Sequence, residues 1–266
     1  MKNTQIISVI NQKGGVGKTT TVINLATALS FHGKKILVID LDPQGNATTG
    51  FGLSSNDNTK TVYDVLNGSS TFEETIRDTK IDNLKLVSSN VDLSGLEVET
   101  ANENRRAFLL KDKIENFINS SQNNFSYIFI DCPPSLSLLT VMSLVVANSL
   151  IVPLQAEFFA LEGLSQLTKT IDRVKFKLNP KLEIRGVLLT MFDKRNKLST
   201  EVDTEARKFF KEKVYKTVIP RNVRLSEAPS HGMPVLIYDK SCSGSKSYLS
   251  FMEEFLKQEN IMESAA

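Results

Sequence analysis

A glycine-rich stretch between an apolar run and a helix-forming run restricts the fold of this chain more than any other segment. Ile6–Ile10 predicts a buried strand, and Thr19–Phe31 predicts a helix with apolar residues on one side. Between them lies Gln12-Lys13-Gly14-Gly15-Val16-Gly17-Lys18-Thr19-Thr20. Glycines allow backbone N–H groups to turn inward around phosphate oxygens, and the N-terminus of the helix adds a partial positive charge. Strand, loop and helix together predict a phosphate-binding loop.

The rest of the chain alternates apolar runs with helical periods. Further strands are predicted at Ile36–Ile39, Leu84–Val87, Tyr127–Ile130, Leu150–Val152, Ile184–Leu189 and Val214–Ile219. Helices are predicted near Arg106–Ile118, Leu138–Ala147, Leu161–Phe176, Thr200–Lys213 and Ser247–Leu256. Continuous apolar strands separated by helices are typical of α/β folds, in which a mostly parallel, twisted sheet carries helices on both faces. We expect one domain over residues 1–266, with Gly50–Thr61 as a surface loop.

The glycine-rich loop carries two lysines with different expected roles. Its nucleotide-binding residues are Gly14, Gly15, Val16, Gly17, Lys18, Thr19 and Thr20. Lys18 would reach the β- and γ-phosphates, and the Thr19 hydroxyl would bind Mg²⁺. The ordinary pattern has glycine where Gln12 stands, and Lys13 is an additional cation. Because Lys13 is at the entrance of the loop, it would project away from its own phosphates; a local salt bridge is the alternative.

Carboxylates follow two of the predicted strands. Asp40 and Asp42 are two residues apart, so they share one face of an extended segment. Asp131 ends the apolar run Tyr127–Ile130, which is the Walker B arrangement for holding Mg²⁺ through a coordinated water. Ligands of such sheets bind beyond the carboxyl ends of the strands, where all three residues are expected. A metal or redox role for Cys132 is disfavoured, because Cys242 is the only other cysteine.

The loop and the string Asp40-Leu41-Asp42-Pro43-Gln44-Gly45-Asn46 together resemble the ParA/Soj family of partition ATPases, P-loop NTPases with a deviant Walker A motif. The similarity continues in three further segments, Gln155–Gly163, Leu188–Asp193 and Ile219–Ser230. The resemblance implies ATP and Mg²⁺ as cofactors and hydrolysis of ATP to ADP and phosphate. It implies that Lys13 crosses a dimer interface to the partner's nucleotide, and that Asp42 orients the attacking water. Asp40 would support the loop or lie in the outer coordination sphere of Mg²⁺, and the adenine would lie near Met191, Pro220 and Asn222.

The resemblance also implies non-specific binding to double-stranded DNA and stimulation by a ParB/Spo0J-type protein. Arg195 and Arg224 match family positions associated with DNA, and both are expected in loops that follow strands. Lys194, Lys197, Arg221 and Lys246 would add to the same face. From Lys169 to Lys246 there are 18 Lys or Arg residues against 9 Asp or Glu residues, a local excess typical of phosphate-backbone binding. A solvated basic surface is the alternative.

Composition excludes several other classes of protein. A net charge of +2 excludes a globally basic nucleic-acid coat. There is no apolar run of about 20 residues and no signal-peptide pattern, so we expect a cytoplasmic protein. The resemblance to the family implies that it is also nucleoid-associated. We expect no N-terminal helix-turn-helix domain, because the family resemblance already begins at about Ile6.

Three rival functions remain. The closest is a MinD-like, membrane-associated regulator of the division site. Its membrane helix would be the C-terminal one, but the segment Phe251–Glu263 is acidic, so no membrane contact is expected. An iron–sulfur ATPase would need clustered cysteines, and a small-molecule ligase or kinase would have no evident use for Lys13.

Overall fold

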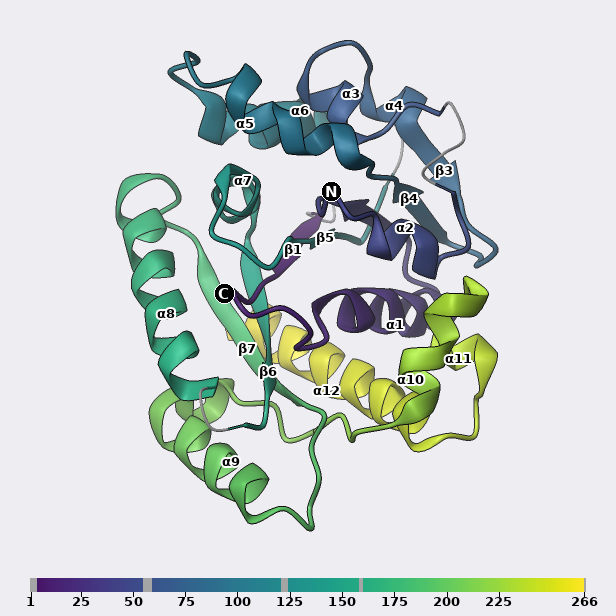
Figure 1. Ribbon diagram of the computed structural model, residues 1–266, viewed down its shortest axis with the longest axis vertical. Coiled ribbons are helices and arrows are strands. Elements are labelled where there is room, and N and C mark those ends of the chain that lie inside the picture. Colours follow the sequence, from purple (N-terminus) through teal and green to yellow (C-terminus); the bar gives the residue numbers. More distant parts are fainter. Residues whose placement is uncertain (1–3, 55–58, 121–123, 158–159, 266) are drawn as a thin grey trace.

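A seven-stranded sheet forms the centre of the computed structural model, which describes residues 4–54, 59–120, 124–157 and 160–265 (Figure 1). The strands are β1 (Gln5–Val9), β2 (Ile36–Asp40), β3 (Ile76–Asp78), β4 (Leu84–Val87), β5 (Tyr127–Asp131), β6 (Ser149–Gln155) and β7 (Glu183–Thr190). Their order is β3-β4-β2-β5-β1-β6-β7, and all neighbours are parallel except β3 and β4. The predicted α/β class with a mostly parallel sheet is therefore confirmed.

Helices cover both faces because both faces of each central strand are apolar. Along β1, Ile7 and Val9 pack with α1 (Lys18–Phe31) and α12 (Ser243–Ala265), whereas Ile6 packs into the opposite layer. That second layer contains α6 (Leu109–Ser120), α7 (Leu138–Val146), α8 (Ala160–Lys177) and α9 (Lys197–Phe210). Figure 1 shows α1 and α12 side by side on one side of the sheet. Alternation of side chains along each strand thus builds two cores around one sheet.

Short helices in the connections were not predicted. They are α2 (Asn46–Gly50), α3 (Val62–Leu66), α4 (Phe72–Thr75), α5 (Leu96–Glu99), α10 (Val223–Glu227) and α11 (Val235–Tyr238). The antiparallel edge strand β3 was also missed, since three residues carry little periodicity. Residues 55–58 of the expected loop Gly50–Thr61, and residues 158–159 of the Gln155–Gly163 segment, lie outside the described residues.

The predicted strand Val214–Ile219 is wrong. This segment has one isolated parallel bridge, Val214 with Val187, and a second isolated bridge, Pro220 with Phe192, lies just beyond its end. Between the bridges, the backbone N–H groups of Lys216 and Thr217 donate to the Glu254 carboxylate of α12, at 2.6 and 2.8 Å. A side chain from the last helix therefore interrupts the ladder between the Tyr215 and Ile219 N–H groups, which still donate to carbonyls of β7.

The carboxyl ends of three central strands meet at one edge of the sheet. Asp131, the last residue of β5, is in register with Val9 of β1 on one side and with Asp40 of β2 on the other. The loops that follow these three strands therefore start next to one another, as expected for a parallel sheet that binds a ligand beyond its carboxyl ends.

Candidate nucleotide-binding and catalytic site

The glycine-rich loop joins β1 to α1 as predicted. Gly17 is the N-cap of α1 with φ = 90°, a left-handed conformation that disfavours any side chain. The loop is closed on itself, because the Lys18 ammonium donates to the Lys13 carbonyl at 3.2 Å. The Thr190 hydroxyl at the end of β7 donates to the Val16 carbonyl at 2.8 Å, which fixes the loop to the sheet.

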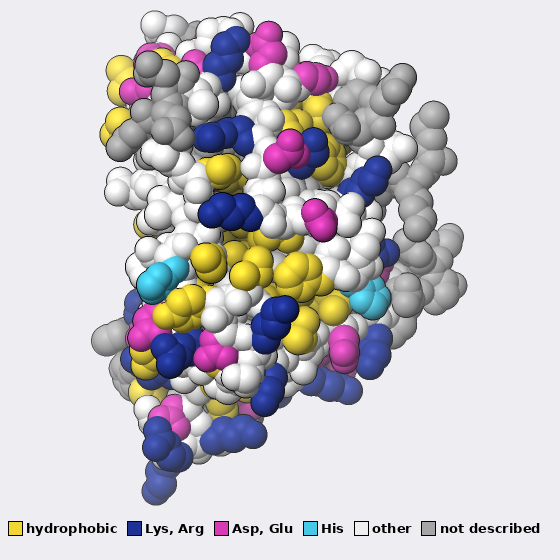
Figure 2. Space-filling view, turned by 90° about the vertical axis from the view of Figure 1, so that its right-hand side faces the viewer, with side chains coloured by type: hydrophobic (Ala, Val, Ile, Leu, Met, Phe, Trp, Pro, Cys, Tyr) yellow, Lys and Arg dark blue, Asp and Glu magenta, His cyan; other side chains and the backbone are white. Residues whose placement is uncertain are grey.

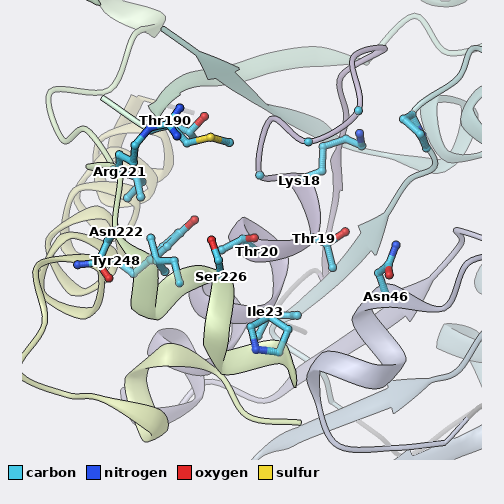
Figure 3. Close-up of a pocket in the computed structure, with 18 of the residues that line it drawn as sticks. Lys18, Thr19, Thr20, Ile23, Asn46, Thr190, Arg221, Asn222, Ser226 and Tyr248 are labelled. Carbon is cyan, nitrogen blue, oxygen red and sulfur yellow. The ribbon is translucent and has the colours of Figure 1, made fainter. Parts of the chain in front are cut away.

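A cleft of about 590 Å³ opens over this loop. Its lining includes Gly14, Gly15, Gly17, Lys18, Thr19 and Thr20 from the predicted nucleotide site, together with Asp42 and the predicted base residues Met191, Pro220 and Asn222. Figure 3 shows Lys18, Thr19 and Asn46 at one side of the cleft and Arg221, Asn222 and Tyr248 at the other. The fold thus brings two predicted groups, about 170 residues apart in sequence, into one cavity. Val16 is buried beneath the loop and does not line the cleft.

The predicted base end has a constrained backbone. Met191 adopts φ = 48°, which is uncommon for a residue other than glycine and is typical of functional sites. Asn222 caps α10: its Oδ1 accepts from the Arg224 N–H at 2.9 Å, and its Nδ2 donates to the Ser243 hydroxyl at 2.8 Å. One donor hydrogen of the Asn222 amide remains for a ligand.

The three predicted carboxylates have different surroundings. Asp40 is fully buried, and its Oδ2 accepts from both the backbone N–H and the hydroxyl of Thr48, each at 2.8 Å. These contacts favour the alternative in which Asp40 supports its loop. Asp42 lines the cleft, and its Oδ1 accepts from the Gln44 N–H at 3.0 Å. Asp131 accepts a 2.7 Å hydrogen bond from the Thr19 hydroxyl through Oδ2.

These three carboxylates are all buried. Burial raises the pKa of Asp40 to about 6, and burial together with the neighbouring Asp40 holds the pKa of Asp131 well above its usual range. Burial also lowers the pKa of Lys18, although Asp131 opposes that change. Such a site favours an added cation.

The residues present fit a magnesium ion. Asp131 Oδ1 is buried and has no hydrogen-bond partner among the described residues, which leaves an acceptor beside the Thr19 hydroxyl. No cluster of three or more His, Cys, Asp or Glu side chains arranged to hold a metal occurs in the described part of the chain. Mg²⁺ does not need such a cluster, because it keeps several waters and takes one or two protein ligands plus phosphate oxygens. Thr19 and Asp131 could hold it, with Asp40 behind them.

Lys13 lies outside the cleft that Lys18 lines. Its ammonium forms an ion pair with Glu157, in the loop after β6, and the two side chains retain 47% and 32% of their exposure. The local salt bridge considered from the sequence is therefore present in the single chain. The ion pair keeps the Lys13 ammonium at the surface, away from the cleft over its own phosphate loop.

The two arginines predicted to bind DNA are exposed but already paired. Arg195 makes a bidentate contact with Asp193, at 3.0 and 2.9 Å, and its side chain is 90% exposed. Arg224 lies in α10 and not in the expected loop, and it contacts Glu227 at 2.8 Å and Asp239 at 3.5 Å. Figure 2 shows Lys and Arg side chains gathered more densely toward the lower end of one face. Exposed pairs of this kind contribute only about 0–1 kcal/mol, so a phosphate could displace the carboxylates.

Several cleft residues were not among those predicted to bind the nucleotide. Tyr248 of α12 lines the cleft and shares a 3.2 Å hydrogen bond with the Thr21 hydroxyl of α1. Asn46, Arg221 and Ser226 also line it. Asn46 belongs to the segment that resembles the family and could have been suspected, whereas Tyr248 is placed only by the packing of α12 on α1.

Comparison with known proteins identifies the family. A family model described as an AAA domain matches residues 4–184. The chromosome partitioning protein ParA of Caulobacter vibrioides is 48% identical over 98% of this chain and 97% of its own. The sporulation initiation inhibitor protein Soj of Bacillus subtilis is 47% identical over 94% of this chain and 97% of its own.

A solved structure agrees over the same length. It is a cobyrinic acid a,c-diamide synthase from Mycobacterium smegmatis with bound ATP analog and magnesium, 32% identical, with a TM-score of 0.84 over 96% of this chain and 95% of that chain. The fold, the cleft and the near full-length similarity lead to one conclusion: this chain belongs to the ParA/Soj family and is a P-loop ATPase.

Proposed function

We propose that this ATPase partitions DNA, a chromosome or a plasmid, by pairing two ATP-loaded subunits. The observation that carries the proposal is the position of Lys13, which lies outside its own cleft while Lys18 occupies it. A second lysine beside the loop has a use if it completes the site of another subunit, where it supplies positive charge to the γ-phosphate. The names of the relatives from Caulobacter and Bacillus support this assignment.

In the proposed mechanism, each residue of the cleft has one task. Backbone N–H groups of Gly14–Thr20 and the Lys18 ammonium hold the phosphates, and Met191, Pro220 and Asn222 hold the adenine. Mg²⁺ held by Thr19 and Asp131 would neutralise charge on the β- and γ-phosphates. Asp42 orients the attacking water from the cleft wall, and Lys13 of the second subunit stabilises the charge that develops. Turnover is slow in a monomer because that last charge is missing.

The closed dimer would bind double-stranded DNA without sequence preference through Arg195, Arg224 and neighbouring basic residues. Two basic faces side by side neutralise more phosphates than one, so DNA binding depends on ATP-driven pairing and weakens with salt. A ParB-type partner then stimulates hydrolysis, and the dimer leaves the DNA. The place of action would be the nucleoid in the cytoplasm, and residues 1–266 would act as one ATPase domain.

Sedimentation velocity with a slowly hydrolysed ATP analogue, with and without duplex DNA, tests the proposal. We expect a monomer with ADP, a dimer with the analogue, and co-sedimentation of DNA with the dimer alone. A protein that stays monomeric at high concentration with the analogue would contradict it and favour a small-molecule ligase or kinase.

A MinD-like membrane function is the second candidate, and the packing of α12 disfavours it. Tyr248, Phe251, Met252 and Phe255 of this helix are buried in the core that it shares with α1. The apolar side of α12 is therefore buried inside this chain, over the residues whose side chains are described. Within the described part of the chain, no helix has the length and apolar character needed to cross a bilayer. Liposome flotation with ATP separates the two functions, since strong binding to lipid would favour the MinD-like one.

A further inference from the structure

Two walls of the nucleotide cleft touch each other through a pair of glycines. The first wall, which we call the acidic wall, is the segment from Asp42 to Gly52. The second, the base wall, is the segment from Asn222 to Gly232. Both line the cleft, the acidic wall with Asp42, Asn46 and Thr49 and the base wall with Asn222, Leu225, Ser226, Pro229 and Ser230.

The acidic wall is a single hydrogen-bonded unit. The Gly45 N–H donates to the Asp42 carbonyl at 2.9 Å, the Thr49 N–H to the Gly45 carbonyl at 3.0 Å, and the Gly52 N–H to the Thr49 carbonyl at 2.9 Å. Phe51, only 2% exposed, anchors the end of the wall in the core. A displacement of Gly52 is therefore passed back through consecutive turns to Asp42.

The base wall runs from α10 directly into a 3₁₀ turn at Ala228–His231. The Leu225 N–H donates to the Asn222 carbonyl at 3.2 Å, and the Gly232 N–H donates to the Pro229 carbonyl at 3.0 Å. Asn222 begins this wall as the cap of α10 and also lines the predicted base end of the cleft. A ligand that moves Asn222 would therefore move Gly232.

The walls meet backbone to backbone, with no side chain between them. A Cβ atom on Gly52 would lie 2.8 Å from the Gly232 carbonyl oxygen, and a Cβ on Gly232 would lie 2.7 Å from the Gly52 Cα. Both residues are left-handed, with φ of 76° and 61°. Only glycine fits both the conformation and the spacing, and a contact without flexible side chains transmits small shifts with little loss.

We propose that the Gly52–Gly232 contact is a joint through which the base wall sets the position of Asp42. Gly52 and Gly232 are then positioning residues for hydrolysis, and occupation of the base end is linked to the geometry of the attacking water. The inference rests on the proposed role of Asp42. It adds that the rate of hydrolysis depends on a contact that touches neither the phosphates nor the water.

Gly232→Ala is the direct test. The added methyl group meets the Gly52 backbone, which cannot rotate away, so the walls must separate by several tenths of an ångström. Misplacement of a catalytic group by up to about 1 Å costs up to about 100-fold in rate, so we expect kcat to fall about 10- to 100-fold. The phosphate loop is untouched, and only the base end shifts with its wall. We therefore expect the Kd for ADP and the KM for ATP to rise by less than about threefold, a smaller change than the tenfold or greater fall in kcat.

Gly33→Ala is the matched control. Gly33 is also left-handed, with φ = 78°, but a Cβ there meets nothing within 4 Å. It carries the same backbone strain without the contact, so its kcat should equal that of the wild type. Thermal unfolding of both variants shows whether they are folded; if Gly232→Ala is not, Gly52→Ala displaces the same joint from the other side.

Phosphate release, measured for each variant together with ADP affinity, decides between the outcomes. An unchanged kcat in the folded glycine variants would refute the proposed joint. A loss of ADP affinity as large as the loss in kcat would also refute it, because that result indicates general collapse of the cleft. Asp42→Ala measured in parallel separates the two hypotheses. If that variant hydrolyses ATP normally, the role of Asp42 fails, whatever the glycine variants do.

Discussion

Lys13→Gln should leave the fold and the nucleotide site intact while abolishing ATP-dependent pairing. In the single chain, the substitution removes one ion pair, whose partners retain 47% and 32% of their exposure. Such a pair contributes about 0.2–1 kcal/mol, which for a chain of this size corresponds to a fall in Tm of less than about 4 °C. ADP affinity should not change, because Lys13 does not line the cleft.

The effect on the dimer is expected to be much larger, because symmetry doubles it. Each interface would contain two Lys13 ammonium groups, each making a charge-assisted hydrogen bond worth about 1.5–3 kcal/mol. Losing both removes about 3–6 kcal/mol, which weakens the dimer by about 10²- to 10⁴-fold. Sedimentation equilibrium with a slowly hydrolysed ATP analogue measures this constant, with Lys18→Ala as the control that loses nucleotide binding.

Glu157→Gln tests the same reasoning with the opposite sign. The variant removes the carboxylate that holds Lys13 in its own chain, so each subunit gains about 0.2–1 kcal/mol toward pairing. The dimer should tighten by about 2- to 30-fold. A Lys13→Gln protein that pairs like the wild type would refute the role of Lys13 in the neighbouring site. A dimer weakened by Glu157→Gln would refute the competition between the two contacts.

Three other variants or treatments test separate features of the structure. Asp193→Asn should strengthen DNA binding in a low-salt gel shift, because the Arg195 guanidinium loses the carboxylate that engages it through two hydrogen bonds. Unchanged binding in both this variant and Arg195→Ala would exclude this loop from the DNA site. Phe251→Ala should lower stability by about 3–5 kcal/mol in urea unfolding, because this fully buried ring joins α12 to the core over β7; a loss below about 1 kcal/mol would contradict that packing. Cys132 should resist iodoacetamide in the native state while Cys242 reacts. Burial raises the pKa of the Cys132 thiol to about 12, which keeps it protonated at neutral and mildly basic pH. Equal labelling of the two cysteines, read by mass spectrometry of tryptic peptides, would show that the end of β5 is open to solvent.

Local patterns were sufficient for the parallel strands of the sheet and for the phosphate loop. The strand, loop and helix around Gly14–Thr20 are encoded within about 25 consecutive residues, so the sequence predicts their relation in space. The carboxyl ends of parallel strands meet at one edge by topology alone, which placed Asp42 and Asp131 correctly beside the loop. The predicted strand Val214–Ile219 failed because the residue that interrupts it is not local: Glu254, some 40 residues later, takes the N–H groups of Lys216 and Thr217.

Charge is the property for which the sequence is least informative, because a count of basic residues does not show which charges are free. Lys13, Arg195 and Arg224 were each assigned to an external ligand, and each is paired with a carboxylate of its own chain. Two of these carboxylates, Asp193 and Glu227, are within three residues of their arginines, so the pairing itself could have been anticipated. Because exposed pairs are weak, they lower affinity for a phosphate without preventing it, and they orient the guanidinium groups in advance. In the proposed DNA binding, the local excess of positive charge would set an upper limit on affinity, and the paired acids would determine how far below that limit the monomer stays.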